Sequence, residues 1–158
     1  MIQFKKHSNI YCLTVNQDIK VPIDVAWSFF SNPNNLQEIT PNDMDFKITN
    51  SPSEEMYSGQ IITYKIKLLP FYSASWVTEI KAVTPLESFI DEQRFGPYSM
   101  WHHTHLFKET KDGTTMTDQV YFKIPFGFLG RIAYRLFIKK KLKSIFTYRE
   151  KMVNSIFK

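Results

Sequence analysis

The sequence contains very little cysteine and glycine. Its 158 residues include five glycines and a single cysteine, Cys12. One cysteine excludes a disulfide bond within the chain and is typical of proteins in a reducing compartment, so we expect a cytoplasmic location. The glycines form no glycine-rich phosphate-binding loop, Walker motif or dinucleotide-binding fingerprint, and we therefore expect no nucleotide chemistry.

Long apolar runs are also missing. No stretch approaches the roughly 20 apolar residues that a membrane-spanning helix needs, so we expect no stable membrane insertion. Residues 1–12 include two lysines and a histidine but lack the continuous apolar segment of a secretory signal. The hydrophobic fraction of 43% and the aromatic fraction of 16% suffice for the core of one globular domain, which we assign to residues 1–158.

Acidic residues are scarce near the C-terminus. Residues 129–158 contain nine of the 20 lysines and arginines but only one acidic residue, Glu150, so the basic character of the chain originates there. A basic amphipathic helix can bind an anionic membrane, a partner or a nucleic acid, or its charges can simply solubilise the outer face of a packed helix. We expect the last of these, with the apolar stripe buried, no nucleic-acid partner, and only weak, salt-sensitive attraction to anionic lipid.

Alternating apolar and β-branched residues, separated by proline, glycine, asparagine, aspartate and serine, predict seven β-strands. After the first strand, Asp24 and the apolar residues that follow it predict a short helix, and residues 35–39 predict a second helical turn. The short connections between the later strands favour antiparallel hairpins. The predicted strands are 10–21, 46–49, 60–68, 75–83, 88–94, 100–109 and 114–123.

Apolar residues with a spacing close to 3.6 begin at Leu129 and continue to Phe157. They predict a helix about 45 Å long at about 1.5 Å per residue, with the lysines of 139–141 interrupting the apolar stripe near its middle. A long amphipathic helix needs a large surface to cover its stripe, and the sheet provides one. The predicted fold is therefore α+β: a seven-stranded curved antiparallel sheet, with two short helices after the first strand, wrapped around a long C-terminal helix.

The strand predicted over 100–109 has a mixed set of side chains on one face. Because side chains alternate along a strand, Trp101, His103, His105 and Phe107 point the same way. Bulk water would leave the aromatic rings exposed, and a tight core would leave the imidazole nitrogens needing partners. A lined cavity suits both kinds of side chain and is the environment we expect.

Neighbouring strands are expected to contribute further residues to this cavity. In the arrangement that we favour, the inward positions of 88–94 and 114–123 place acidic and amide side chains beside the imidazoles, where they can share hydrogen bonds. A shift of one residue would turn Ile90, Glu92 and Arg94 inward instead. The predicted cavity-lining residues are Trp76, Phe89, Asp91, Gln93, Trp101, His103, His105, Phe107, Met116 and Asp118.

Segments spread over nearly the whole chain carry a family resemblance: 25–36, 39–41, Trp76 with 78–80, 89–93, 96–98, 101–107 and 116–118. With the order of the elements, they resemble the START-like (SRPBCC) superfamily, which includes the birch-pollen allergen, lipid-transfer START domains and polyketide cyclases. In detail the chain is similar to a bacterial, mostly uncharacterised, ligand-binding-type subfamily related to polyketide cyclase/dehydrase-like proteins. The resemblance implies the helix-grip fold, with a cavity between the sheet and the C-terminal helix.

The paired histidines allow three interpretations. They can belong to a hydrogen-bonded network that orients a ligand, to a zinc or iron site completed by Asp91 or Asp118, or to a general acid–base pair. We favour the network and expect no bound metal or cofactor. The predicted function is binding of a small hydrophobic or aromatic molecule, lipid-like or polyketide-like. The alternatives are a cyclase, dehydratase or hydrolase that uses His103 or His105, and a peripheral membrane or partner-binding protein that uses the basic helix.

Overall fold

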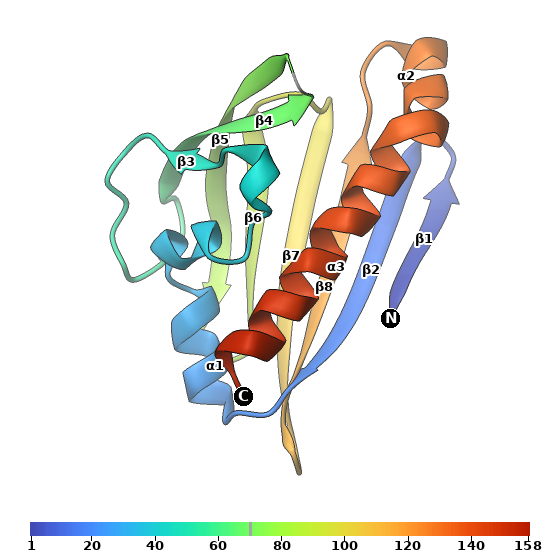
Figure 1. Cartoon of the computed structure of the whole chain (residues 1–158). Helices are drawn as coiled ribbons and strands as arrows, with labels where there is room; N and C mark the ends of the chain where they lie inside the picture. The colour runs from blue at the N-terminus through green and yellow to red at the C-terminus, as the bar shows by residue number, and fades with distance from the viewer. Residues whose placement is uncertain (70) are drawn as a thin grey trace.

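The computed structural model describes residues 1–69 and 71–158 as one eight-stranded antiparallel sheet with helices on one face (Figure 1). The strands follow one another across the sheet in the order β1-β2-β8-β7-β6-β5-β4-β3. The long helix α3 (Lys139–Ile156) lies diagonally across the face that we call the inner face. The strands are β1 (Ile2–His7), β2 (Ile10–Ile19), β3 (Lys47–Ile48), β4 (Ile61–Leu69), β5 (Tyr72–Thr84), β6 (Ser88–Phe95), β7 (Met100–Thr110) and β8 (Gly113–Lys123).

The prediction of seven strands is wrong by one. The seven expected strands correspond to β2–β8, and the additional strand β1 pairs with β2 from Ile2 opposite Val15 to His7 opposite Ile10. Only two side chains of β1 are partly buried, so this edge strand lacks the apolar alternation that reveals a strand in a sequence. Ser8 adopts a positive φ of 55°, in the tight turn between the two strands.

The short helices also differ in detail from the prediction. Helix α1 (Ile23–Phe30) follows β2 as expected, but the second helical turn is a 3₁₀ helix, η1 (Pro33–Gln37), and a third short helix, η2 (Asn42–Met44), follows it. Asn32 Oδ1 accepts a hydrogen bond of 3.0 Å from the backbone N–H of Asn34. This cap, with a proline at the first helical position, starts η1 two residues before the predicted helical turn.

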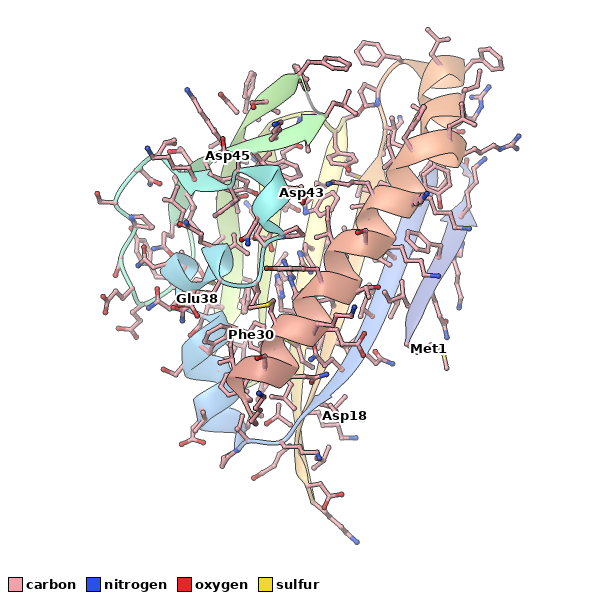
Figure 2. The ribbon with its side chains drawn as sticks, viewed as in Figure 1. Met1, Asp18, Phe30, Glu38, Asp43 and Asp45 are labelled. Atoms are coloured by element: carbon pink, nitrogen blue, oxygen red, sulfur yellow. The ribbon has the colours of Figure 1, made fainter. Side chains whose placement is uncertain are left out.

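Buried apolar side chains form two core clusters on the inner face of the sheet. The first cluster joins α1 to the sheet and includes Phe30 of α1 (labelled in Figure 2) and Phe107 of β7. The second packs against the start of α3 and includes Phe122 and Phe146, with Trp101 at its border. Along β7, the positions between Trp101 and Phe107 on this face are His103 and His105. The histidine pair therefore lies where the two apolar clusters meet.

The C-terminal helical segment changes its buried face partway along its length. Helix α2 (Gly127–Ala133) continues through a π-helical stretch, Tyr134–Ile138, into α3. A π-helical turn holds an additional residue, so the residues that face the sheet before and after it do not lie on one 3.6-residue stripe. In α3, Leu142, Phe146 and Val153 are buried, as a stripe packed on the sheet requires.

The expected burial of the apolar stripe is wrong for its first part. Leu129, Leu136 and Phe137 are 67%, 61% and 63% exposed, whereas Gly130 and Tyr134 face inward. In Figure 1, α2 lies above the ends of β1, β2 and β8 and not over their inner face, so the sheet does not cover its apolar side. None of the helices in the described part of the chain is both long and apolar enough to cross a membrane.

Candidate ligand cavity

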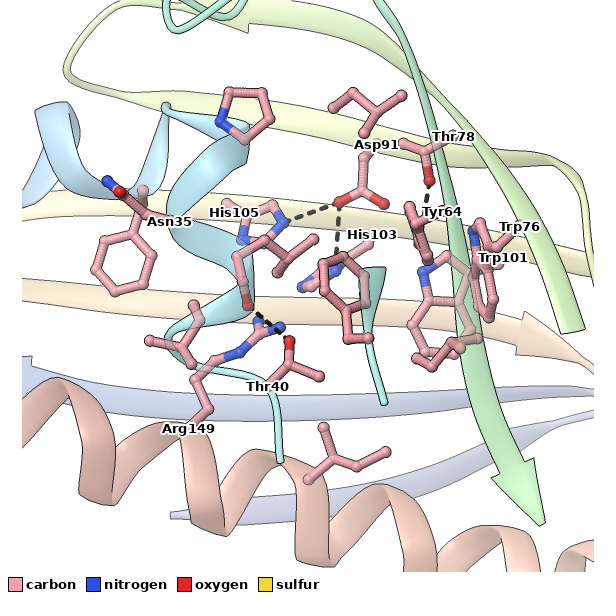
Figure 3. Close-up of a pocket in the computed structure, with 18 of the residues that line it drawn as sticks. Asn35, Thr40, Tyr64, Trp76, Thr78, Asp91, Trp101, His103, His105 and Arg149 are labelled. Carbon is pink, nitrogen blue, oxygen red and sulfur yellow. Dashed lines mark hydrogen bonds and ion pairs between the residues drawn. The ribbon is translucent and has the colours of Figure 1, made fainter. Parts of the chain in front are cut away.

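A cavity of about 170 Å³ lies between the inner face of the sheet, the short helices and α3 (Figure 3). Most of its wall is apolar, with Phe30 and Ile39 on the side of the short helices and Leu142 and Phe146 on the side of α3. Aromatic residues of the sheet, including Trp76 and Trp101, form the rest of the apolar wall. The titratable groups of the wall are Tyr64, Asp91, Tyr98, His103, His105 and Arg149.

Two aspartates and two histidines form a buried group that we call the Asp–His cluster: Asp91, His103, His105 and Asp118. His103 Nε2 lies 2.8 Å from Asp118 Oδ1, and His105 Nε2 lies 2.9 Å from Asp91 Oδ2. The Nδ1 atoms approach the opposite carboxylates, at 3.4 Å for His103 to Asp91 and 2.9 Å for His105 to Asp118. The last contact is an ion-pair contact and not a hydrogen bond. His105 Nδ1 has no hydrogen-bond partner among the described residues. Each carboxylate thus lies against both rings.

The register of three neighbouring strands brings these four residues together. Pairing of β6 with β7 places Asp91 opposite His103, and pairing of β7 with β8 places His105 opposite Asp118. The diagonal contacts follow from the same pairing, because such neighbours are within reach of long side chains. The side chain of His102 points to the other face of the sheet, where its Nδ1 lies 2.7 Å from Glu92 Oε1. The alternation along β7 therefore separates His102 from the cluster.

The two buried histidines differ in their affinity for a proton. Burial and the neighbouring charge of His105 lower the pKa of His103, and the attraction of Asp91 and Asp118 offsets only part of this effect. Burial also disfavours the charged form of His105, but its close contacts with Asp118 and Asp91 outweigh burial and raise its pKa. His105 is therefore the histidine of the cluster that holds a proton more strongly, and His103 the one that loses it more readily.

The two carboxylates stay ionised despite their burial. Burial alone would raise the pKa of Asp118, but its hydrogen bonds and charge interactions with His103 and His105 outweigh burial and hold the pKa far below its ordinary value. The same balance of burial against His103 and His105 lowers the pKa of Asp91. The cluster thus contains two negative charges that need two positive ones.

Arg149 of α3 supplies the second positive charge. Its Nη1 lies 3.8 Å from Asp118 Oδ1, and its guanidinium group lies 5.0 Å from the centre of the Phe146 ring. Asp91 and Asp118 are then matched by Arg149 and protonated His105, so the buried group carries no net charge. Such matching lowers the cost of keeping ionised groups out of water.

Besides His105 Nδ1, two buried N–H donors of cavity-wall residues lack partners. Neither Trp76 Nε1 nor Arg149 Nε has a hydrogen-bond acceptor among the described residues. A buried donor without a partner costs about 1–3 kcal/mol. Both residues belong to the cavity wall, so an oxygen atom of a bound molecule that reached either N–H would gain a hydrogen bond.

Three members of the cluster also form a set that could hold a metal ion. Asp91, His103 and His105 each offer a ligand atom within 4.8 Å of the others, and carboxylate and imidazole suit zinc or iron. A divalent cation would compete with the proton on His105 and add charge to a group that Arg149 already balances. The arrangement therefore suits a hydrogen-bonded network better than a metal site.

Six of the ten residues predicted to line the cavity lie in its wall: Trp76, Phe89, Asp91, Trp101, His103 and His105. Phe107 and Met116 instead belong to the first core cluster. Asp118 contacts the two histidines without contributing to the wall described here. Gln93 binds the backbone of Tyr98, donating at 2.7 Å and accepting at 3.1 Å, and so stabilises the turn between β6 and β7.

Arg149 is the charged residue of the site that the sequence interpretation did not include. It occupies the same face of α3 as Leu142, Phe146 and Val153, with spacings of four, three and four residues. An arginine within an otherwise apolar helical stripe is a signal of a buried charge that needs a partner, and it was available in the sequence. Tyr64 also lies in the wall, where its hydroxyl is 3.3 Å from Thr78 Oγ1.

No protein-family model and no curated protein sequence matches the chain. Solved structures with a similar fold include a protein from Rhodobacter sphaeroides, with 13% identity and a TM-score of 0.71 over 99% of this chain and 97% of that one. Major latex-like protein 151 from Panax ginseng shows 11% identity and a TM-score of 0.70 over 95% and 99% of the two chains. A protein from Staphylococcus epidermidis shows 16% identity and a TM-score of 0.67 over 98% and 95%.

These likenesses show the fold alone. The chain shares with the latex-like protein the large antiparallel sheet and C-terminal helix that the helix-grip prediction describes. The coarse prediction of fold is thereby confirmed, and the resemblance to a particular bacterial subfamily stays a prediction.

Replacing Asp118 with asparagine tests the charge balance of the cluster. The substitution leaves protonated His105 and Arg149 opposite a single carboxylate, and we expect a loss of about 3–5 kcal/mol of unfolding free energy near neutral pH. The lowered pKa of Asp118 means that its contribution is complete above the ordinary value of 3.8 and is lost as the pH falls below it. Urea unfolding of both proteins between neutral and acidic pH measures this difference.

The difference between the two proteins should therefore narrow in acid. Asp112→Asn, at an exposed turn position, is the matched control and should change stability little at any pH. The ionised state of Asp118 in the cluster would be contradicted if the difference in unfolding free energy stayed constant down to strongly acidic pH. It would also be contradicted if the Asp118→Asn variant were as stable as the native protein near neutral pH.

Proposed function

We propose that this protein binds a compact ring compound that carries a hydrogen-bond-accepting oxygen, inside the cavity beneath α3. The observation that carries the proposal is the pair of unpartnered donors, Trp76 Nε1 and Arg149 Nε, on residues of a mostly apolar wall. Few, well-placed polar groups in a mostly apolar cavity are typical of small-molecule sites. A cytoplasmic location fits this role and stays a prediction.

The size of the cavity favours one of the predicted ligand classes. A cavity of about 150 Å³ lined by apolar side chains accommodates benzene, and the cavity here is about 170 Å³. A single substituted ring matches this space, whereas a long acyl chain would need the wall to open. We therefore favour an aromatic or polyketide-like ring over a lipid.

The aromatic wall favours a flat ligand. The Trp76 and Trp101 rings meet edge to face at 5.3 Å, and Tyr64 stacks on Trp76 at 5.8 Å. Such surfaces bind a ring through stacking and edge contacts without demanding a particular substituent. The donors of Trp76 and Arg149 would then select ligands that carry an acceptor oxygen.

Acetophenone and ethylbenzene form a matched pair of probes, because they share a ring and an alkyl group but only acetophenone has a carbonyl oxygen. We expect acetophenone to bind more tightly, by roughly three- to tenfold, which is the net contribution of one hydrogen bond. Quenching of tryptophan fluorescence, supported by NMR shifts of the Trp76 indole N–H, measures both affinities.

Two variants test whether Trp76 and Arg149 cause the preference for acetophenone over ethylbenzene. Trp76→Phe and Arg149→Met should each reduce the preference for acetophenone, whereas Trp27→Phe should leave it intact because Trp27 packs against Phe89 and Phe107 in the first core cluster. Equal affinity for the two probes in the native protein would contradict the proposal. Binding of neither probe would contradict it as well.

The different proton affinities of the histidines support a second candidate function, proton transfer on a bound carbonyl compound. The lowered pKa of His103 suits a general base and the raised pKa of His105 suits a general acid, with ring centres 3.8 Å apart. His103 would take a proton from the carbon next to the carbonyl while His105 gives one to the carbonyl oxygen. The product is the enol, and no proton is gained or lost overall.

Exchange of the acetophenone methyl protons in D₂O tests this candidate. If the histidines act in this way, the methyl signal in the proton NMR spectrum decays faster with the native protein than with His103→Gln, whereas His102→Gln behaves like the native protein. Binding of acetophenone without accelerated exchange would leave the binding function standing and exclude the catalytic one.

A further inference from the structure

A group of apolar side chains on α2 and next to it is exposed on the surface of the molecule. We call it the α2 surface, and Figure 2 shows side chains of α2 and the preceding loop projecting away from the sheet. The most exposed of them is Phe126 at 81%. Exposed apolar side chains that occur singly need no explanation, but a contiguous group marks an interaction site. The group consists of Phe126, Phe128, Leu129, Ile132, Leu136 and Phe137.

The backbone before α2 is strained in a way that exposes an aromatic ring. Phe126 has a φ of 67°, in the left-handed region that bulky residues rarely adopt, and Gly127 follows it at 50°. Gly130 lets α2 approach Pro125, since a Cβ at this position would lie 2.1 Å from the Pro125 carbonyl oxygen. Strain of this kind persists mostly where it serves a function. Here the Phe126 ring gains little burial within the chain in return for it.

The charged side chains of the helical segment that carries the α2 surface are all positive as far as Arg149. No acidic residue occurs between Asp118 and Glu150, whereas Arg131, Arg135, Lys139, Lys140 and Lys143 follow one another along the helical segment. Lys141 is paired with Asp43 of η2 at 2.9 Å. A partner that covers this surface therefore has to be anionic as well as apolar.

A basic hollow lies beside the α2 surface. It measures about 300 Å³ and its lining includes Lys6 of β1, Lys123 at the end of β8, Phe126 and Arg131 of α2. The described residues that line it include no acidic side chain. Three cationic side chains line this hollow beside an exposed aromatic ring, a combination that suits a phosphate group at the edge of an apolar phase.

A second exposed apolar segment lies at the same end of the molecule. Leu69 at the end of β4, Phe71 just before β5 and Tyr72 at the start of β5 are all exposed. Figure 1 shows this end of the β4–β5 hairpin and α2 at the same end of the molecule. The cavity wall includes Leu68, the neighbour of Leu69, so the cavity reaches toward this end as well.

From these observations we propose that the α2 surface docks on membranes rich in anionic phospholipid. The aromatic and aliphatic side chains enter the interfacial region, the basic side chains contact the headgroups, and the hollow with Lys6, Lys123 and Arg131 receives a headgroup phosphate. Docking does not require the helix to leave the sheet, because Leu129, Leu136 and Phe137 are already outside. It is a peripheral, reversible contact, distinct from insertion of a spanning helix.

The charge pattern disfavours two other occupants of the α2 surface, a second copy of the chain and a nucleic acid. Two copies of the chain meeting through the α2 surface would bring their arginines and lysines together without compensating acids. A nucleic acid would neutralise the charges but would leave Leu129, Ile132 and Leu136 against a polar phosphate backbone. An anionic bilayer satisfies both the charges and the apolar side chains.

Co-sedimentation with vesicles tests the proposal on the full chain. The probe is phosphatidylcholine with about one quarter phosphatidylglycerol, in about 0.15 M salt. We expect binding that weakens in high salt, and that Phe128→Ser with Leu136→Ser lowers the partition coefficient by about tenfold or more. Changing Lys139, Lys140 and Lys143 together to glutamine should also weaken binding and flatten its salt dependence.

Matched controls use exposed residues elsewhere on the chain. Leu86→Ser with Leu106→Ser, and Lys108→Gln with Lys111→Gln, should leave binding unchanged, and all variants should melt at nearly the native temperature because the side chains are exposed. Absence of native binding, or equal binding to pure phosphatidylcholine, would overturn the proposal. So would a concentration-dependent dimer, seen by light scattering, that Phe128→Ser with Leu136→Ser abolishes.

Discussion

The close contact of two aspartates with two buried histidines, balanced by Arg149, is the constraint on which the cavity depends. Asp91, His103, His105 and Asp118 lie on the inner face of β6, β7 and β8, with every carboxylate against both imidazoles. An ionised carboxylate on this face would be prohibitively costly without these partners. Because the cluster lies between two apolar core clusters, the core cannot close over this part of the sheet as a purely apolar layer.

The helix completes this arrangement from the opposite side. Arg149 brings the charge that the aspartates need, while Leu142 and Phe146 on the same face of α3 cover the neighbouring apolar side chains. The space left between them has two unpartnered donors and an aromatic wall. Packing, charge balance and ligand recognition therefore depend on the same few positions, and a change that serves only one of them would disturb the others.

Much of this site follows from the period of two along a strand. The alternation in 100–109 places Trp101, His103 and His105 on one face, and antiparallel pairing then brings Asp91 and Asp118 beside them. Gln93 illustrates the limit of this reasoning. The pairing of β5 with β6 contains register shifts, and the Gln93 side chain binds the backbone of Tyr98, so a position that is correct for the pattern need not reach the cavity. Short-range alternation does not specify such bulges.

The structure also differs from the sequence prediction near the two ends of the chain, and there the causes are not register shifts. Strand β1 owes its existence to pairing with β2 and not to an apolar pattern of its own, so its sequence did not reveal it. The exposed apolar residues of α2 have helical spacing, as a buried stripe would, because periodicity shows which side chains share a face but not whether a surface covers that face. These residues are exposed because α2 lies beyond the sheet and because the π-helical stretch after it changes the helix face that packs on the sheet.

The most direct test of the central claim is the protonation state of each histidine ring, measured by ¹⁵N NMR as a function of pH. The account predicts that His105 keeps protons on both ring nitrogens above the ordinary histidine pKa of 6.5, whereas His103 stays neutral below it. If His103 and His105 titrated together near 6.5, or if His103 were the ring that held the extra proton, the charge balance proposed for the cavity would be wrong.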